Sequence, residues 1–260
     1  MKLGPYAAWC AQYGLNSSHT IYTVRPRKNG CYKYMSVGLV VGLATADIGR
    51  RVAEATIAIS LKGAHKLYEF VRRMGETKTL AGWVFGARMH QIFQCGGSFK
   101  ATKLGGSTAI TIGIDHKACK DLSKASEFGS LLRKHAGSPS INPDIISGYF
   151  KRQHGNLRSV NSAAIARFAT TDKPVLVLFQ MTVSTLHPVK EPGLASIWAE
   201  ILEELRETPP IFVFVVPTDI ASTFAEQTIG PAGSRTSASN TPDFDKWEQY
   251  VLSVSDKVLW

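Results

Sequence analysis

The sequence has few cysteines and no Cys-x-x-Cys pair. Cys10, Cys31, Cys95 and Cys119 are widely spaced along the chain. His116 and Cys119 stand three residues apart, but no second ligand pair accompanies them, and a structural zinc site needs four ligands. We therefore expect free thiols in a reducing compartment, with neither a zinc site nor a disulfide framework.

A long apolar run is also missing. The segment from Met35 to Ala46 comes nearest, but it is too short for a bilayer and is interrupted by serine, glycine and threonine. Residues 1–10 carry one lysine and no apolar core typical of a signal peptide. We expect no membrane partner and an intracellular location, in the cytoplasm or nucleus, or inside a host cell if the protein is an effector.

Acidic residues are the minority among the charged ones. The 260 residues include 30 Lys and Arg against 20 Asp and Glu, which gives a net charge of +10. This excess predicts a polyanionic partner, most often nucleic acid. The alternative is a basic surface that only keeps the protein soluble. A hydrophobic content of 44% indicates a folded chain with a sizeable core.

The most informative stretch runs from Val175 to Lys190. Its first residues form a nearly continuous aliphatic run, which predicts a strand buried on both faces at the centre of a sheet. Gln180 and Thr182 interrupt the run, and their spacing of two places them on one face. The two residues either cap the strand or join a buried hydrogen-bond network, or they open onto a polar site.

The chain after this stretch predicts a parallel crossover. Glu191 to Leu205 has helical spacing, and Ile211 to Val216 reads as a second buried strand. The predicted fold class is therefore α/β, with a mixed central sheet flanked by helices. Residues 170–174 are predicted as a turn before the central strand, and 158–168 as a candidate strand.

The first half of the chain gives helical and turn signals. Val24 to Gly30 reads as a turn between short extended pieces. A helical pattern runs from Thr45 to Arg73, with Gly63 as a candidate break. A second helix is predicted over Leu80 to Phe93, with Thr79 as its N-cap.

The remaining segments are assigned more simply. Phe99 to Leu104 and Ser107 to Ile114 predict a hairpin turning at Gly105 and Gly106. A short helix is predicted over Asp121 to His135, and a helix or mixed segment over Phe244 to Val258. We expect one domain over 1–260, which comprises an N-terminal helical extension (1–78), a core (79–217) and a C-terminal segment (218–260).

Three motifs in this order resemble a known family. They are Ala81 to His90 followed by Cys95 to Phe99, then Asn161 to Phe168, and finally Leu178 to Ser184 with His187 to Lys190 and Phe212 to Pro217. Together they resemble the nuclease-like domain of Crinkler and retrotransposon-hot-spot-type proteins, a divergent PD-(D/E)XK domain. The resemblance implies a restriction-endonuclease-like fold. The P-loop that often precedes such domains is missing here.

The resemblance also implies a magnesium site, from which this sequence departs. It implies a glutamate on the first core helix, an aspartate before the central strand, and a polar pair on that strand. The acidic residues would hold Mg²⁺, which activates water for phosphodiester cleavage. Gly86 and Ala166 stand at the two acidic positions. Asp144 is the candidate replacement and metal ligand, with Glu76 and Asp172 as further alternatives.

The resemblance and the charge pattern give two sets of candidate residues. The catalytic set is Gln180, Thr182, His187, Lys190 and Asp144, and the nucleic-acid-binding set is Lys190, His90, Arg88 and Arg167. Each set has a structural alternative: His90 suits a core position, and Lys190 suits a solvated surface.

The leading hypothesis is a nuclease-like protein that binds DNA or RNA and whose metal-dependent phosphodiesterase centre is impaired. The first alternative is an active Mg²⁺-dependent endonuclease with relocated carboxylates. The second is an effector or immunity protein in which the fold is only a scaffold for a protein partner.

Overall fold

The chain divides into two compact units, residues 1–83 and 84–260. The structure is a computed structural model. It describes residues 22–28, 34–43, 46–73, 77–116, 120–122, 148–152, 159–168, 171–200, 206, 208–230, 244 and 247–260. No helix among these residues is long and apolar enough to cross a bilayer.

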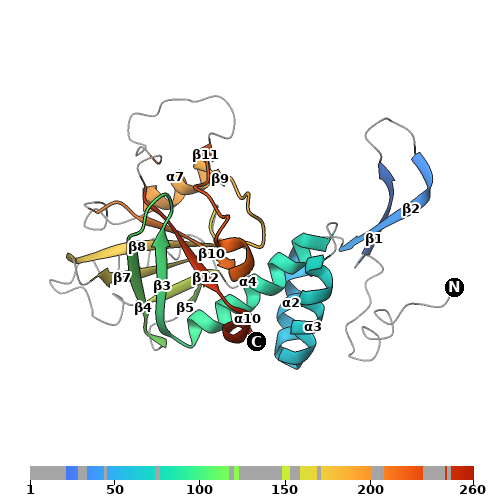
Figure 1. Ribbon diagram of the computed structural model, residues 1–260, viewed down its shortest axis with the longest axis horizontal. Coiled ribbons are helices and arrows are strands. Elements are labelled where there is room, and N and C mark those ends of the chain that lie inside the picture. The colour runs from blue at the N-terminus through green and yellow to red at the C-terminus, as the bar shows by residue number, and fades with distance from the viewer. Residues whose placement is uncertain are drawn as a thin grey trace. The chain divides into compact units, whose positions relative to one another are not determined.

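The first unit contains a hairpin whose first strand extends into the segment predicted as a turn between short extended pieces. Strands β1 (Tyr22–Lys28) and β2 (Tyr34–Leu43) pair antiparallel, with Tyr22 opposite Leu43 (Figure 1). The predicted turn at Val24 to Gly30 is therefore wrong over Val24 to Lys28. Pro26 misled the prediction, because a two-stranded ribbon has only edge strands, and an edge strand tolerates proline.

Two helices follow in the first unit, α2 (Ala46–Ile59) and α3 (Leu61–Arg73). The helical pattern is confirmed, but the break falls at Ser60 and not at Gly63. The Ser60 Oγ accepts a hydrogen bond from the Gly63 backbone N–H at 3.0 Å, which satisfies a free donor in the first turn of α3.

The second unit is built on an eight-stranded mixed sheet. Its strands are β3 (Gly97–Lys103), β4 (Ala109–Ile114), β5 (Lys120–Leu122), β6 (Tyr149–Arg152), β7 (Ser162–Phe168), β8 (Thr171–Met181), β10 (Ile211–Pro217) and β12 (Gln249–Val254). Their order is β4-β3-β12-β10-β8-β7-β6-β5. Strands β8, β10 and β12 run parallel at the centre, and antiparallel neighbours flank them.

The predicted central strand and crossover are confirmed. Every residue from Val175 to Met181 is buried, and α7 (Glu191–Glu200) connects β8 to its parallel neighbour β10. The strand begins at Thr171, so the turn predicted over 170–174 is wrong for 171–174. Proline is tolerated near the first residues of a strand, where a ladder bond is readily given up.

One further prediction is corrected. Residues 120–122 form β5 in place of the predicted start of a helix, because they pair in parallel with β6, and 123–135 lie outside the described residues. Of the helix or mixed segment predicted over Phe244 to Val258, the mixed alternative is confirmed: β12 lies between β3 and β10 inside the sheet, and a short helix begins at Asp256. Long-range pairing decides both strands, and a local pattern does not reveal it.

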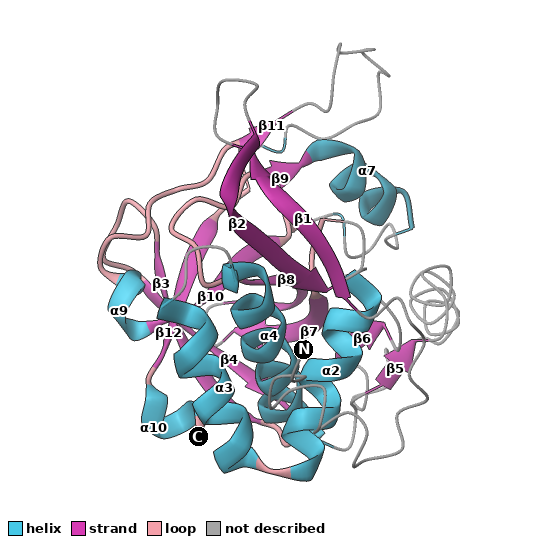
Figure 2. Cartoon of the chain, turned by 90° about the vertical axis from the view of Figure 1, so that its right-hand side faces the viewer, coloured by secondary structure: helices cyan, strands magenta, loops and turns pink. Residues whose placement is uncertain are grey.

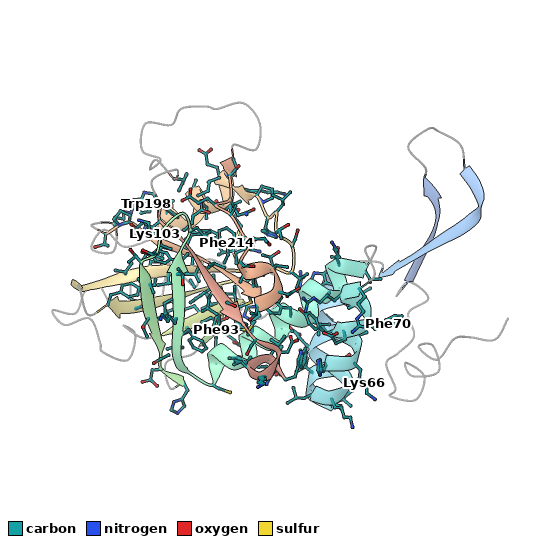
Figure 3. All side chains as sticks on the ribbon, in the orientation of Figure 1. Lys66, Phe70, Phe93, Lys103, Trp198 and Phe214 are labelled. Carbon is teal, nitrogen blue, oxygen red and sulfur yellow. The ribbon has the colours of Figure 1, made fainter. Side chains whose placement is uncertain are left out.

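Helices cover both faces of the sheet. On one face, the Phe93 ring of α4 (Lys78–Gln94) lies 4.8 Å from the ring of Phe179 and 5.4 Å from that of Tyr149. On the other face, Leu194 of α7 packs in one core with Phe214. We call these the α4 face and the α7 face. Figure 3 shows Phe93 and Phe214 among the side chains that fill the unit.

The remaining elements are short. They are β9 (Val189–Lys190), paired in parallel with β11 (Ile229–Gly230), and the single-turn helices α9 (Thr218–Ala221) and α10 (Asp256–Leu259). In both ribbon views α7 lies beside the β9–β11 pair (Figures 1 and 2). Helix α4 begins at Lys78, so Thr79 lies inside the helix that it was predicted to cap.

Two helical glycines differ in the space around them, which gives a test of the fold. A Cβ at Gly49 would lie 1.7 Å from a ring carbon of Trp83, so we expect Gly49→Ala to lower the free energy of unfolding by roughly 1–3 kcal/mol.

At Gly86 the atom nearest to an added Cβ would be the Met181 Sδ, at 3.9 Å. We expect Gly86→Ala to raise stability by about 0.5–1 kcal/mol. Urea unfolding followed by circular dichroism measures both, and a stable Gly49→Ala variant would contradict this packing.

Candidate functional site

The candidate site lies where β8 ends, at the carboxyl end of the central parallel strands. Gln180 is 6% exposed and Thr182 is 4% exposed. The Thr182 backbone N–H donates to the Val215 carbonyl at 3.0 Å, and its Oγ1 accepts from the Ser184 N–H at 3.1 Å. Thr182 therefore begins the turn that carries the chain out of the sheet.

Gln180 is held by a hydrogen bond to His187. In register with Phe214 of β10, its side chain points to the α7 face, where its Nε2 lies 2.9 Å from the Nε2 of His187. An amide nitrogen only donates, so in this orientation the imidazole accepts through Nε2 and carries its proton on Nδ1. Burial lowers the pKa of His187, which keeps the ring neutral at pH 7.

Two further glutamines, which the sequence did not mark as site residues, extend the hydrogen bond between Gln180 and His187. The Gln227 Oε1 accepts from the His187 backbone N–H at 2.5 Å, and its Nε2 donates to the carbonyls of Thr185 and Ala225 at 3.1 and 2.7 Å. Gln249, at the start of β12, exchanges two 2.8 Å hydrogen bonds with the Gln227 backbone. Gln180, His187, Gln227 and Gln249 form what we call the glutamine network.

The sequence left open whether Gln180 caps the strand, joins a buried hydrogen-bond network or opens onto a polar site. Gln180 joins a buried hydrogen-bond network, and its amide is already engaged there. Neither Gln249, in a strand that no local pattern revealed, nor Gln227 had a signal in the sequence. A glutamine in a connecting loop has no periodicity that marks it as buried.

Asn161 is another residue of the site without an assigned role. Its Oδ1 accepts from the Met181 backbone N–H at 2.6 Å, and its own N–H donates to the Phe179 carbonyl at 2.9 Å. The nearby Ser159 adopts a left-handed φ of 63° and donates through Oγ to the Lys190 carbonyl at 2.6 Å. The segment before β7 thus ties the ends of β8 and β9 together.

Lys190 provides the positive charge of the site. It is the last residue of β9, its side chain is exposed, and α7 begins at the next residue. The structure thus brings Gln180, Thr182, His187 and Lys190 to one end of the sheet, within one short stretch of chain. An exposed lysine can contact a phosphate by its charge, whereas the buried amides of the glutamine network are already hydrogen-bonded within it.

The other candidate residues lie elsewhere. His90 is on the α4 face, opposite to Gln180, and its Nδ1 lies 2.5 Å from the hydroxyl oxygen of Tyr149. The Arg88 Nε donates to the Leu259 carbonyl at 2.6 Å, so this guanidinium binds the C-terminal helix α10. Arg167 pairs with Pro174 near the start of β8.

The positions tied to metal binding do not meet at the end of β8. Gly86 faces Met181, but Ala166 is buried opposite Val175, well before Gln180 along the strand. Asp144 and Glu76 lie outside the described residues. Among the residues that are described, no group of three or more His, Cys, Asp and Glu side chains is placed to hold a metal ion.

The glutamine network predicts a stability cost at Gln227. Gln227→Ala would leave the His187 N–H and two backbone carbonyls without this partner, so we expect a loss of roughly 1–3 kcal/mol in the free energy of unfolding. Glu226→Ala, at the exposed neighbouring position, is the matched control and should change little. Urea unfolding of the two variants tests this, and equal stabilities would argue against the network.

His90 predicts a pH dependence. Burial, with a smaller effect of the Lys151 charge, lowers the pKa of His90 to about 3. The unfolded chain, with a pKa near 6.5, then binds the proton first, so stability falls as the pH drops from about 6.5 toward 3. The expected slope from this group is about 1.4 kcal/mol per pH unit. Unfolding measured at several pH values should show a flatter dependence for His90→Gln, and an unchanged slope would contradict the burial of a neutral His90.

Comparison with known proteins gives no information about this site. The resemblance to the Crinkler-type nuclease domain therefore stays a prediction based on sequence motifs. The chain matches no protein-family model, no curated protein and no solved structure.

Proposed function

We propose that the protein is a nuclease-like nucleic-acid-binding protein whose metal-dependent phosphodiesterase centre is impaired. The observation that carries this proposal is the composition of the site at the end of β8. Amides and an imidazole are hydrogen-bonded to one another there, and the exposed Lys190 follows His187 by three residues. The exposed Lys190 suits contact with a phosphodiester, and no group of three or more His, Cys, Asp and Glu side chains in the described part of the chain is placed to hold Mg²⁺.

The arrangement of the second unit is compatible with a restriction-endonuclease-like fold. A helix, α4, covers one face of a mixed sheet, and the antiparallel run β6, β7, β8 leads through α7 into the parallel strand β10. The motifs that resemble the nuclease family fall on these elements. The net charge of +10 supports a polyanionic partner.

The two departures from the acidic pattern support an impaired centre. At position 86 the helix offers no side chain, and the atom nearest to its Cβ direction is the Met181 thioether. A thioether is a soft ligand and is poorly suited to Mg²⁺. Ala166 is 1% exposed in an apolar surrounding, where an unpaired carboxylate would be costly.

A carboxylate supplied to this site from another position would support the alternative of an active Mg²⁺-dependent endonuclease. Asp172 is a poor replacement, because it precedes Gln180 by eight residues in the same strand, which is roughly 26 Å of extended chain. Asp144 and Glu76 are the replacements that remain for this alternative. The third reading is a scaffold for a protein partner. Cleavage and binding assays with nucleic acid distinguish it from the impaired and the active nuclease.

The proposal predicts binding without cutting. We expect plasmid DNA and an RNA transcript to remain intact with Mg²⁺ or Mn²⁺, as they do with a chelator, and to be retained in a salt-dependent way. Lys190→Ala should weaken binding at every sequence tested and reduce the slope of log K against log salt by about 1. Lys100→Ala removes the same charge from the exposed surface of β3 and serves as the control.

Three outcomes separate the readings. Metal-dependent cutting would overturn the impaired centre and direct attention to Asp144 and Glu76. Equal effects of the two lysine variants would remove Lys190 from the site. Absence of both cutting and binding would favour the protein-interaction scaffold.

A further inference from the structure

Helix α3 in the first unit carries an exposed basic ridge with an aromatic ring in it. Ala64, Tyr68 and Val71 form its buried side. Lys62, Lys66, Phe70 and Arg73 are exposed and recur at spacings of four, four and three, which aligns them along the helix. We call these four residues the α3 ridge, which extends over roughly 16 Å of helix.

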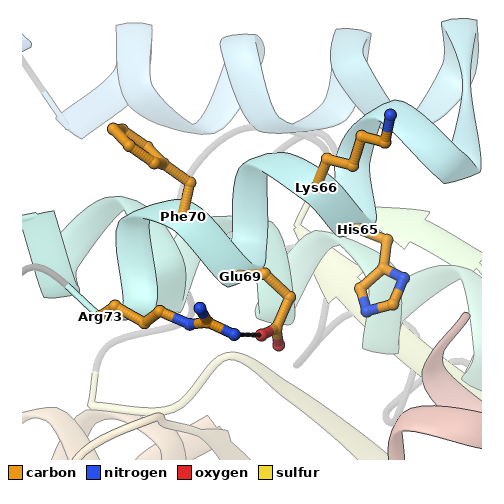
Figure 4. A pocket seen from close by; sticks show the side chains of 5 residues that line it. All are labelled: His65, Lys66, Glu69, Phe70 and Arg73. Atoms are coloured by element: carbon orange, nitrogen blue, oxygen red, sulfur yellow. Dashed lines mark hydrogen bonds and ion pairs between the residues drawn. The ribbon is translucent and has the colours of Figure 1, made fainter.

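Phe70 is the unusual member of the ridge. Its side chain is 63% exposed and lies between Lys66 and Arg73 in the sequence of the ridge. A shallow hollow of about 500 Å³ is lined by His65, Lys66, Glu69, Phe70 and Arg73 (Figure 4). The aromatic ring is therefore accessible from solvent beside positive charge.

The two exposed large apolar residues described in α3, Leu61 and Phe70, do not lie on one face of this helix. Leu61 is 41% exposed, but nine residues separate it from Phe70, and this spacing rotates it about half a turn to the other side of the helix. An interfacial membrane helix needs several apolar side chains on one face. The ridge presents a single ring among cations.

Positive charge dominates the helix. Helix α3 contains four cationic residues, Lys62, Lys66, Arg72 and Arg73. Its acidic residue, Glu69, pairs with Arg73 at 3.2 Å. The Arg73 side chain is 80% exposed, and an ion pair this exposed is weak because water and salt screen it. Arg73 is therefore available to an incoming anion. Arg72 is placed differently, over the Tyr68 ring at 5.5 Å.

We propose that the α3 ridge binds single-stranded nucleic acid, with phosphates on Lys62, Lys66 and Arg73 and a base stacked on Phe70. This assignment rests on the proposed function, which makes nucleic acid the partner. Single strands fit the ridge better than duplexes do, because an unpaired base offers a free face to an aromatic ring. The ridge adds a second contact, separate from the site at the end of β8.

The test measures the binding of fluorescein-labelled dT20 and of a 20-base-pair duplex to the full chain by anisotropy. We expect Phe70→Leu, which keeps an apolar side chain and removes the ring, to weaken dT20 binding about tenfold and to leave duplex binding unchanged. Ile59→Ala, at another exposed apolar position, is the control. Replacing both Lys62 and Lys66 by Gln should lower the salt slope for dT20 by about 1.4.

The contrary outcomes are distinct. Unchanged dT20 binding in Phe70→Leu and in the double lysine variant, with weaker binding in Lys190→Ala, would overturn the ridge and leave the proposed function standing. An equal loss on dT20 and duplex would overturn base stacking. Retention of poly-glutamate with the same dependence on Phe70 would overturn the ridge as a nucleic-acid site and indicate an acidic protein. Failure of the wild-type chain to bind either oligonucleotide would overturn both proposals.

Discussion

The burial of β8 on both faces is the constraint on which the second unit depends. α4 packs against one side of this strand and α7 against the other, and its residues from Val175 to Met181 are all buried. A polar side chain in such a strand needs a partner, because a lost hydrogen bond is costly in an apolar surrounding. Gln180 meets this need through His187, and Gln227 and Gln249 complete the network.

The same constraint shapes the chemistry at the end of β8. The groups that are buried there are neutral and already bonded to one another, and burial keeps His187 neutral. The positive charge at this end of the sheet comes from the exposed Lys190, the last residue of β9. Under the proposed function Lys190 contacts a phosphodiester, and cleavage would need a metal ligand set or a free base at the same place.

The two proposed contacts with nucleic acid lie in different units and differ in kind. Lys190 is a single exposed cation at the end of β9, three residues after His187 of the glutamine network. The α3 ridge combines exposed cations with an exposed ring, which suits a strand whose bases are free to stack. A protein with both contacts would hold a nucleic acid at two places without cutting it.

Much of the core followed from the sequence. The apolar run at Val175, the helical spacing of α3 and α4, and the crossover to β10 rest on local patterns that burial imposes. The strands β5 and β12 did not follow, because pairing partners far along the chain decide them. The site divided in the same way: the sequence alone marked Gln180, Thr182, His187 and Lys190 as one polar stretch. Only the tertiary structure brought Asn161, Gln227 and Gln249 to it, because hydrogen bonds between distant segments leave no period in the sequence.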